Sequence, residues 1–265
     1  MVQVRLLMKV LAVVCATVVM SGCATTTDDA EAAKVADPFE TPNRFIFAFN
    51  RTLDTFILRP VAVFYRDIVP KPVQDGTHNV LQNVGEPITA INEVLQGEPG
   101  RAGNSLARFV INSTIGILGI FDVAKSMGLN PTKEDFGQTL GVWLKDYHGG
   151  PYLVLPILGP SNPRDSIGLV VDYFIDPFNI AARTWDFEYL MYVRSALEGI
   201  DNRSRTIAAL DDIEKNSLDY YAAIRSAYRQ RREAEIKNQT SRGGVSTPIS
   251  GLGSGGEDRD LALLR

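Results

Sequence analysis

The sequence predicts an all-α fold. No part of the chain alternates strands with helices, and no run follows the two-residue period of a half-buried strand. Apolar residues recur instead at helical spacing, between glycines and prolines that end or bend helices. The chain has 265 residues, of which 45% are hydrophobic and 22% are charged, so it is long enough and apolar enough to bury a sizeable core.

Residues 1–22 resemble a lipoprotein signal peptide. Arg5 and Lys9 precede an apolar run that is too short to be a stable membrane span. The segment Met20-Ser21-Gly22-Cys23 resembles a lipobox, so we expect cleavage before Cys23 and acylation of its thiol, which holds a protein on a bilayer. The alternative is an ordinary secretory signal with an incidental cysteine.

Residues 23–36 are small and polar and are expected to form a tether. Ala24 stands where an aspartate would retain a Gram-negative lipoprotein at the inner membrane, so we expect the periplasmic face of the outer membrane. Acylation leaves no free thiol in the mature chain, and there are only two histidines, so no metal or other cofactor is expected. The net charge of -4 argues against nucleic acid as a partner.

Residues 37–238 are expected to form one helical domain. Its first helix is predicted to begin with Asp37 as the N-cap and Pro38 at the first helical position, and to break after Arg59, before a proline. The helix is apolar on nearly every face, as in a helix that is buried or lies against lipid. The residues expected to mark its membrane-embedded part are Phe45, Phe49 and Leu53.

Further helices are expected, each bounded by a proline, a glycine or a capping residue, over 61–69, 73–84, 86–97, 100–115, 121–127, 135–144 and 162–175. Residues 149–160 are expected to be an apolar loop or a short extended segment. Two long helices over 186–215 and 218–237 are expected to pair antiparallel across a short turn. Residues 239–265 are rich in glycine and serine and are expected to be a disordered tail.

The stretch Phe109–Ala124 is unusually apolar for a soluble helix. As a helix it would span about 24 Å, which is less than the bilayer core of about 30 Å. Gly116 and Gly119 predict a helix that ends near Ile115, a hinged loop, and a return helix from Phe121. We expect this stretch to contact lipid and to move; the alternative is that it simply packs in the core.

No residue pattern points to an enzyme. Ser161 lacks the second glycine of a nucleophile elbow, so it is expected to be the cap before a helix that begins with a proline. His78 and His148 are isolated and are expected to be structural or on the surface. The charged pair Arg164 and Asp165 either clamps a phosphate or belongs to a salt-bridge network where a helix begins.

A series of short motifs occurs in order along the chain: Asp37-Pro38-Phe39-Glu40, Asn43-Arg44, Leu58-Arg59-Pro60, Leu95-Gln96-Gly97, Asn112-Ser113-Thr114, Asp135-Phe136-Gly137-Gln138, Gly150-Pro151-Tyr152 and Gly159-Pro160-Ser161. In these motifs the chain resembles the MlaA (VacJ) family of outer-membrane lipoproteins, over about residues 37–228. One departure is Asp146-Tyr147-His148, where family members more often have a small, glycine-rich run.

This resemblance implies a ring-like single domain with a central amphipathic channel, embedded in the inner leaflet of the outer membrane. It implies that misplaced phospholipids leave the outer leaflet without any bond being broken, and that trimeric porins and an MlaC-like periplasmic carrier are partners. It also implies a gating hairpin beside the channel, whose residues here are Asn112, Ile115, Gly116, Ile117, Gly119 and Phe121. The alternative from another class is a lipid-anchored scaffold of porin or envelope assemblies that transports nothing.

Overall fold

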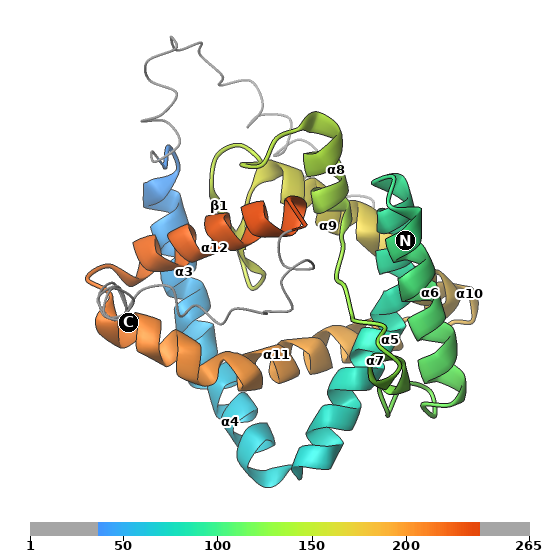
Figure 1. Cartoon of the computed structure of the whole chain (residues 1–265). Helices are drawn as coiled ribbons and strands as arrows, with labels where there is room; N and C mark the ends of the chain where they lie inside the picture. The colour runs from blue at the N-terminus through green and yellow to red at the C-terminus, as the bar shows by residue number, and fades with distance from the viewer. Residues whose placement is uncertain (1–36, 239–265) are drawn as a thin grey trace, which may run out of the picture. The chain divides into compact units, whose positions relative to one another are not determined.

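The computed structural model describes residues 37–238, which form helices and one two-stranded sheet (Figure 1). The expected all-α fold is confirmed. The predicted signal peptide, Cys23, the tether and the tail lie outside the described residues. Within residues 37–238, no helix is both long enough and apolar enough to cross a membrane.

The first three elements form one unbroken helical run. They are α3 (Glu40–Leu53), the π-helical turn η1 (Asp54–Leu58) and α4 (Arg59–Ile68). The predicted break after Arg59 is therefore wrong. A proline ring normally collides with the carbonyl four residues earlier, but the wider turn of η1 lies directly ahead of Pro60 and leaves room for it. The predicted N-cap at Asp37 is also wrong, because Pro38 and Phe39 form a turn and α3 begins after them.

Two predicted helices are in fact one. The helix α5 (Lys71–Leu95) runs through Pro87 without a break. Local propensity opposes a proline there, but packing overrides it, because α5 shares extensive contacts with α6 (Pro99–Thr114). A row of buried polar residues on α5 lies at this interface with α6.

The middle of the chain follows its predicted order more closely. The short helix α7 (Val123–Ser126) precedes α8 (Phe136–Leu144), and Asp135 caps the latter. The segment predicted as a loop or extended contains a hairpin of β1 (Leu153–Leu155) and β2 (Gly159–Ser161), with Leu153 opposite Ser161. Asn162 then caps α9 (Pro163–Ile175), so the predicted cap at Ser161 is wrong, because Ser161 is the last residue of β2 and the side chain of Asn162 accepts the bond from Asp165 N.

The last helices pack differently from expectation. After the unpredicted α10 (Pro177–Thr184) come α11 (Tyr189–Asn216) and α12 (Tyr220–Ile236). They were expected to pair with each other, but α11 packs mainly against α4, and α12 packs against α8 and β2. Ion pairs contribute to this arrangement, because Asp211 of α11 binds Arg59 of α4, and Arg232 of α12 binds Asp135, the N-cap of α8.

The contacts between the elements of residues 37–238 form a closed circuit (Figure 1). The helix α4 packs on α11, α11 on α5, α5 on α8, and α8 on α12. The sheet then links α12, which contacts β2, to α3, which contacts β1 and continues into α4. The order of contacts is therefore ring-like.

Burial in this structure is inverted relative to a water-soluble domain. Among the described residues, buried polar and charged residues outnumber buried hydrophobic ones, and nearly half of the latter are alanines. Large hydrophobic side chains are instead exposed on most helices. The one hydrophobic core cluster among the described residues is small and consists of Tyr152, Val154 and Tyr221, with Ile46, Phe47 and Tyr228 against it.

Candidate functional site

The segment 115–122 forms a tight hairpin between α6 and α7, and we call it the 115–122 hairpin. Its backbone is fixed by hydrogen bonds from Gly119 N to Asn112 O at 2.7 Å and from Phe121 N to Gly116 O at 2.9 Å. The side-chain amide of Asn79 on α5 also donates to Ile120 O at 3.0 Å. The hairpin is therefore held closely to α5 and α6.

The two glycines of the hairpin make this close approach possible. A Cβ on Gly116 would lie 2.3 Å from Phe121 O, which no real side chain tolerates. Gly119 has a φ of +91°, and a Cβ there would lie 2.6 Å from the Cβ of Asn83 on α5. Both positions are buried, so the geometry demands glycine for packing as well as for backbone conformation.

The tip of the hairpin is apolar, exposed and conformationally strained. Ile117 and Leu118 have φ values of 52° and 55°, in the left-handed region that a β-branched residue in particular avoids. Their exposed fractions are 58% and 73%. The other large apolar residues exposed along the hairpin are Ile115, Ile120 and Phe121. The predicted residues thus meet in one exposed apolar turn, except for Asn112 and the two glycines.

Asn112 lies inside the structure and fixes the base of the hairpin. Its Oδ1 accepts from Ala124 N at 2.9 Å, and its Nδ2 donates to Asp122 Oδ1 at 3.0 Å. The carboxylate of Asp122 also accepts from Lys125 N and so caps α7. Asn112 therefore connects the end of α6 to the start of α7, and it has almost no surface for contact with lipid.

A buried charge cluster lies beneath the hairpin. The guanidinium of Arg108 is almost fully buried and donates to Glu86 Oε1 at 2.6 Å, to Leu129 O at 2.7 Å and to Asp122 Oδ2 at 3.2 Å. Two carboxylates thus share one guanidinium. Burial raises the pKa of Glu86 to about 7 against the opposing effect of Arg108, and its Oε2 has no hydrogen-bond partner.

The partner carboxylate shifts in the other direction. Burial alone would raise the pKa of Asp122, but hydrogen bonds from Arg108 and Asn112 lower it below the ordinary value. Arg108 therefore lies in a buried ion-pair cluster and not at an exposed surface. Glu86 was missed because it precedes Pro87 and was assigned to a helix start.

A second buried network joins α12 to α8 and α9. Arg232 on α12 binds Asp135 Oδ1 at 2.6 Å and Asp165 Oδ2 at 2.8 Å, and Asp165 also accepts from Arg164 at 2.9 Å. Burial opposes ionisation of Asp135, but Arg232 lowers its pKa to about 2. The pair Arg164 and Asp165 therefore belongs to a salt-bridge network, which was one of the two alternatives.

The residues predicted to embed the first helix lie on α3. Phe45 is 78% exposed and Phe49 is 48% exposed, whereas Leu53 is half-buried. Another face of α3 carries Asn43 and Asn50, whose amides bond the backbone of the sheet segment. The helix thus has an apolar, exposed side and a polar side that is hydrogen-bonded to the sheet segment.

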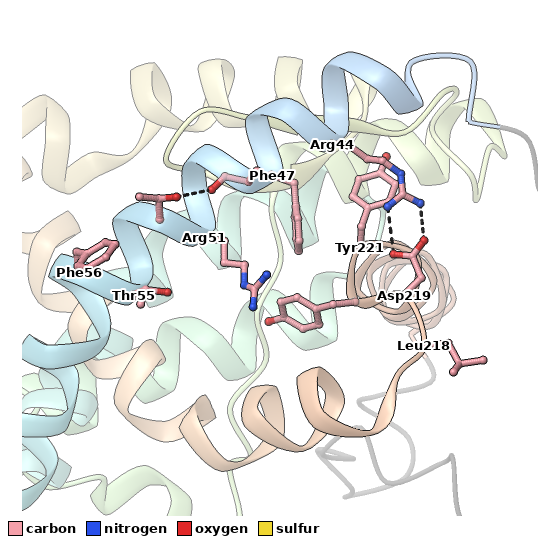
Figure 2. A pocket seen from close by; sticks show the side chains of 11 residues that line it. Arg44, Phe47, Arg51, Thr55, Phe56, Leu218, Asp219 and Tyr221 are labelled. Atoms are coloured by element: carbon pink, nitrogen blue, oxygen red, sulfur yellow. Dashed lines mark hydrogen bonds and ion pairs between the residues drawn. The ribbon is translucent and has the colours of Figure 1, made fainter.

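A pocket of about 710 Å³ lies between α3 and the turn from α11 to α12 (Figure 2). Arg44 pairs with Asp219 at one end and stacks 4.5 Å from the centre of the Tyr221 ring. Figure 2 shows Phe47 and Arg51 pointing from α3 into the space, while Leu218 points away from it. The pocket mixes aromatic and ionic walls, and sequence reasoning did not find it, because its two sides are far apart in the chain.

Comparison with known proteins agrees with this architecture. The model of the MlaA lipoprotein family matches residues 35–235. The intermembrane phospholipid transport system lipoprotein MlaA of Escherichia coli is 34% identical over 82% of this chain and 84% of its own length. Its namesake in Haemophilus influenzae is 30% identical over 83% and 87%, and an uncharacterized protein of Rickettsia bellii is 39% identical over 77% and 78%.

A solved structure is also similar. It was described as the structural basis for maintenance of bacterial outer membrane lipid asymmetry, and it matches with a TM-score of 0.65 and 35% identity. The match covers 76% of this chain and 99% of that one. The resemblance found in the sequence motifs is therefore confirmed, and this chain belongs to the MlaA lipoprotein family.

Proposed function

We propose that this chain is a non-enzymatic outer-membrane component of intermembrane phospholipid transport. It removes misplaced phospholipids from the outer leaflet and passes them to an MlaC-like periplasmic carrier, which maintains lipid asymmetry. The observation that carries the proposal is the inverted burial, with large hydrophobic side chains outside and polar or charged side chains inside. The names of the Escherichia coli and Haemophilus influenzae relatives support it.

The physical reason is the cost of moving a phospholipid. Each acyl CH₂ exposed to water costs about 0.8 kcal/mol, so a lipid leaves a bilayer readily only along a continuous apolar wall. Its headgroup needs polar partners on the same path. A ring-like order of helices with apolar exteriors and polar interiors offers both, and on this proposal its centre is the amphipathic channel.

The proposal also assigns the chain a location at the outer membrane. Acylated Cys23 anchors it to the periplasmic leaflet of the outer membrane, and the exposed side of α3, with Phe45 and Phe49, enters that leaflet. The apolar tip of the 115–122 hairpin contacts lipid beside the channel and gates it. Trimeric porins are the proposed neighbours in the membrane.

The test is replacement of the hairpin tip. Ile117→Asp and Leu118→Asp variants, expressed in a strain that lacks the chromosomal copy, should leave phospholipid in the outer leaflet at the level of the empty strain. Lys133→Asp is the matched control, because it adds an acidic group at another exposed position. Surface labelling of phospholipids gives the measurement, and wild-type asymmetry in both hairpin variants at normal protein levels would refute the gate.

A second test separates transport from a non-transporting scaffold. If the chain transports lipid, the acylated protein, purified in detergent, should copurify with phospholipid that mass spectrometry detects. A scaffold would carry no phospholipid, and its deletion would leave lipid asymmetry unchanged. Those two results together would replace the transport function with the scaffold.

A further inference from the structure

We propose that a second pocket, at the corner between α4 and α5, binds the phosphate-bearing headgroup of an anionic phospholipid. This inference rests on the proposed function, since it names a lipid class that the protein holds. The pocket has a volume of about 430 Å³ and is lined by Arg66, Lys71, Gln74, Ser204, Arg205, Ile207 and Ala208. We call it the corner pocket.

Three cations from three different helices meet in the corner pocket. Arg66 lies in the last turn of α4, Lys71 begins α5, and Arg205 lies on α11. None of the residues that line the pocket is an aspartate or a glutamate, and the carboxylates that pair with the two arginines lie outside the lining. Cations that converge on one pocket favour an anion there.

The cations remain available to a ligand to different degrees. Within residues 37–238, the one ion pair of Arg66 is with its exposed neighbour Asp67, at 2.7 Å, and such surface pairs contribute little. Arg205 binds Asp201 at 3.0 Å and Asp75 at 3.4 Å. Among the described residues Lys71 has no ion-pair partner, so its ammonium is the cation most ready to meet a phosphate.

The corner itself is rigid, which favours binding. The side chain of Gln74 is buried and donates to Val69 O at 2.6 Å and to Arg66 O at 2.9 Å. These bonds satisfy carbonyls at the end of α4 and fix its angle to α5. The cations from the two helices are therefore held close together before a ligand arrives, which lowers the entropic cost of binding.

On the proposed function, the source of the phosphate is a lipid. Phe64, Ile68 and Val73 are close in sequence to the lining residues and are more than half exposed, so these helices also carry apolar surface for contact with acyl chains. The pocket volume suits a headgroup rather than a whole phospholipid. Three cations without a lining carboxylate favour an anionic headgroup, such as phosphatidylglycerol, over a zwitterionic one.

The first arm of the test is a binding titration. The full acylated chain, in an uncharged detergent, is titrated calorimetrically with dihexanoyl phosphatidylglycerol, dihexanoyl phosphatidylethanolamine and inorganic phosphate. We expect phosphatidylglycerol to bind more tightly than the other two probes. Equal affinity for phosphatidylethanolamine would refute recognition of headgroup charge, and equal affinity for inorganic phosphate would show a free-phosphate site instead.

The second arm uses variants. Lys71→Gln should weaken phosphatidylglycerol binding about tenfold, as expected for one charge-assisted contact. Arg66→Gln should also weaken it, whereas Lys133→Gln, an exposed lysine outside the pocket, should not. Unfolding temperatures confirm that the variants fold. Unchanged binding in folded Lys71→Gln, or an equal loss in Lys133→Gln, would overturn the corner pocket.

This result is separable from the proposed function. Loss of lipid asymmetry in the deletion strain tests transport, and the titrations test the pocket. If asymmetry depends on the protein while Lys71→Gln binds normally, only the corner pocket is refuted. If deletion leaves asymmetry unchanged, the transport function fails whatever the titrations show.

Discussion

At the scale of single residues, glycine decides how closely the hairpin approaches α5. Gly119→Val places a branched side chain where even a Cβ is too close to Asn83, and at a φ that valine avoids. We expect this substitution to lower the free energy of unfolding by about 2–4 kcal/mol. Thermal unfolding in detergent measures it.

The matched control is Gly103→Ala on α6. A Cβ at that position meets no atom within 4 Å. Alanine in a helix interior is about 1 kcal/mol more favourable than glycine, so this variant should be slightly more stable than the wild type. Similar losses in both variants would contradict the packing role assigned to Gly119.

Glu86 gives the structure a pH dependence with a definite sign. Its pKa is about 7 when folded, above the ordinary 4.5, so between these values the folded protein holds a proton that the unfolded chain has released. Stability is therefore expected to fall as pH rises through this window, by about 3 kcal/mol at most. Glu86→Gln should remove that part of the slope.

Unfolding temperatures recorded from pH 4.5 to 7.5 check this expectation. The control Glu188→Gln changes an exposed carboxylate, so it should retain the slope of the wild type. An unchanged slope in Glu86→Gln would show that another group carries the dependence. Asp122 acts in the opposite sense, because its pKa is lowered, and its contribution is lost only at lower pH.

At the scale of elements, local signals for helix starts succeeded at two positions and failed at Asp37, after which the first helix begins later than predicted. Asp135 and Asn162 cap α8 and α9 through bonds to Gln138 N and Asp165 N, and these local signals give the helix starts correctly. Two helix breaks predicted from prolines are wrong, because Pro60 follows a π-turn and Pro87 lies within α5. Whether a proline ends a helix depends on packing that a local pattern does not contain.

The site was predictable only where its residues are close in sequence. The apolar turn around Ile117 and the glycines beside it could be found in one stretch of chain. The buried cluster of Glu86 and Arg108, and the two pockets, combine residues from separate helices. Hydrophobic periodicity also assumes an apolar core, whereas the structure exposes large apolar side chains such as Val193 on α11.

The π-turn η1 sets the register of α4 on α11. It lies between the ion pairs of Asp54 with Arg203 and of Arg59 with Asp211, both at 2.7 Å. Deletion of Thr55 would convert the turn to an ordinary α-helix, which covers nearly the same rotation with one residue fewer, and would bring the Pro60 ring against the carbonyl four residues earlier. We expect a loss of about 3 kcal/mol in the free energy of unfolding, measured as a drop in unfolding temperature.

Thr55→Ala is the control, because it keeps the chain length and removes only the hydroxyl and the methyl group of an exposed side chain. Its unfolding temperature should match that of the wild type. A deletion variant as stable as Thr55→Ala would mean that the extra residue of the π-turn is dispensable.

At the scale of the whole molecule, the inverted burial predicts that the helical domain requires a lipid environment even when its acyl anchor is removed. A Cys23→Ser variant lacks the proposed acylation site but keeps the exposed apolar side chains. We expect it to aggregate in buffer and to float with liposomes in a density gradient. A monodisperse Cys23→Ser protein in detergent-free buffer would contradict embedding of the domain itself.

The side chains of Asn43 and Asn50 bond the backbone of residues 152–157, more than 100 positions later. Arg44 likewise forms an ion pair with Asp219, which lies near the end of the domain. Such long sequence separations make folding slow. Of the described helices, the one that is synthesised first is therefore the last to find its partners, and its apolar side stays uncovered during that delay. Synthesis of this protein thus demands protection of α3 against aggregation until the second half of the chain has arrived.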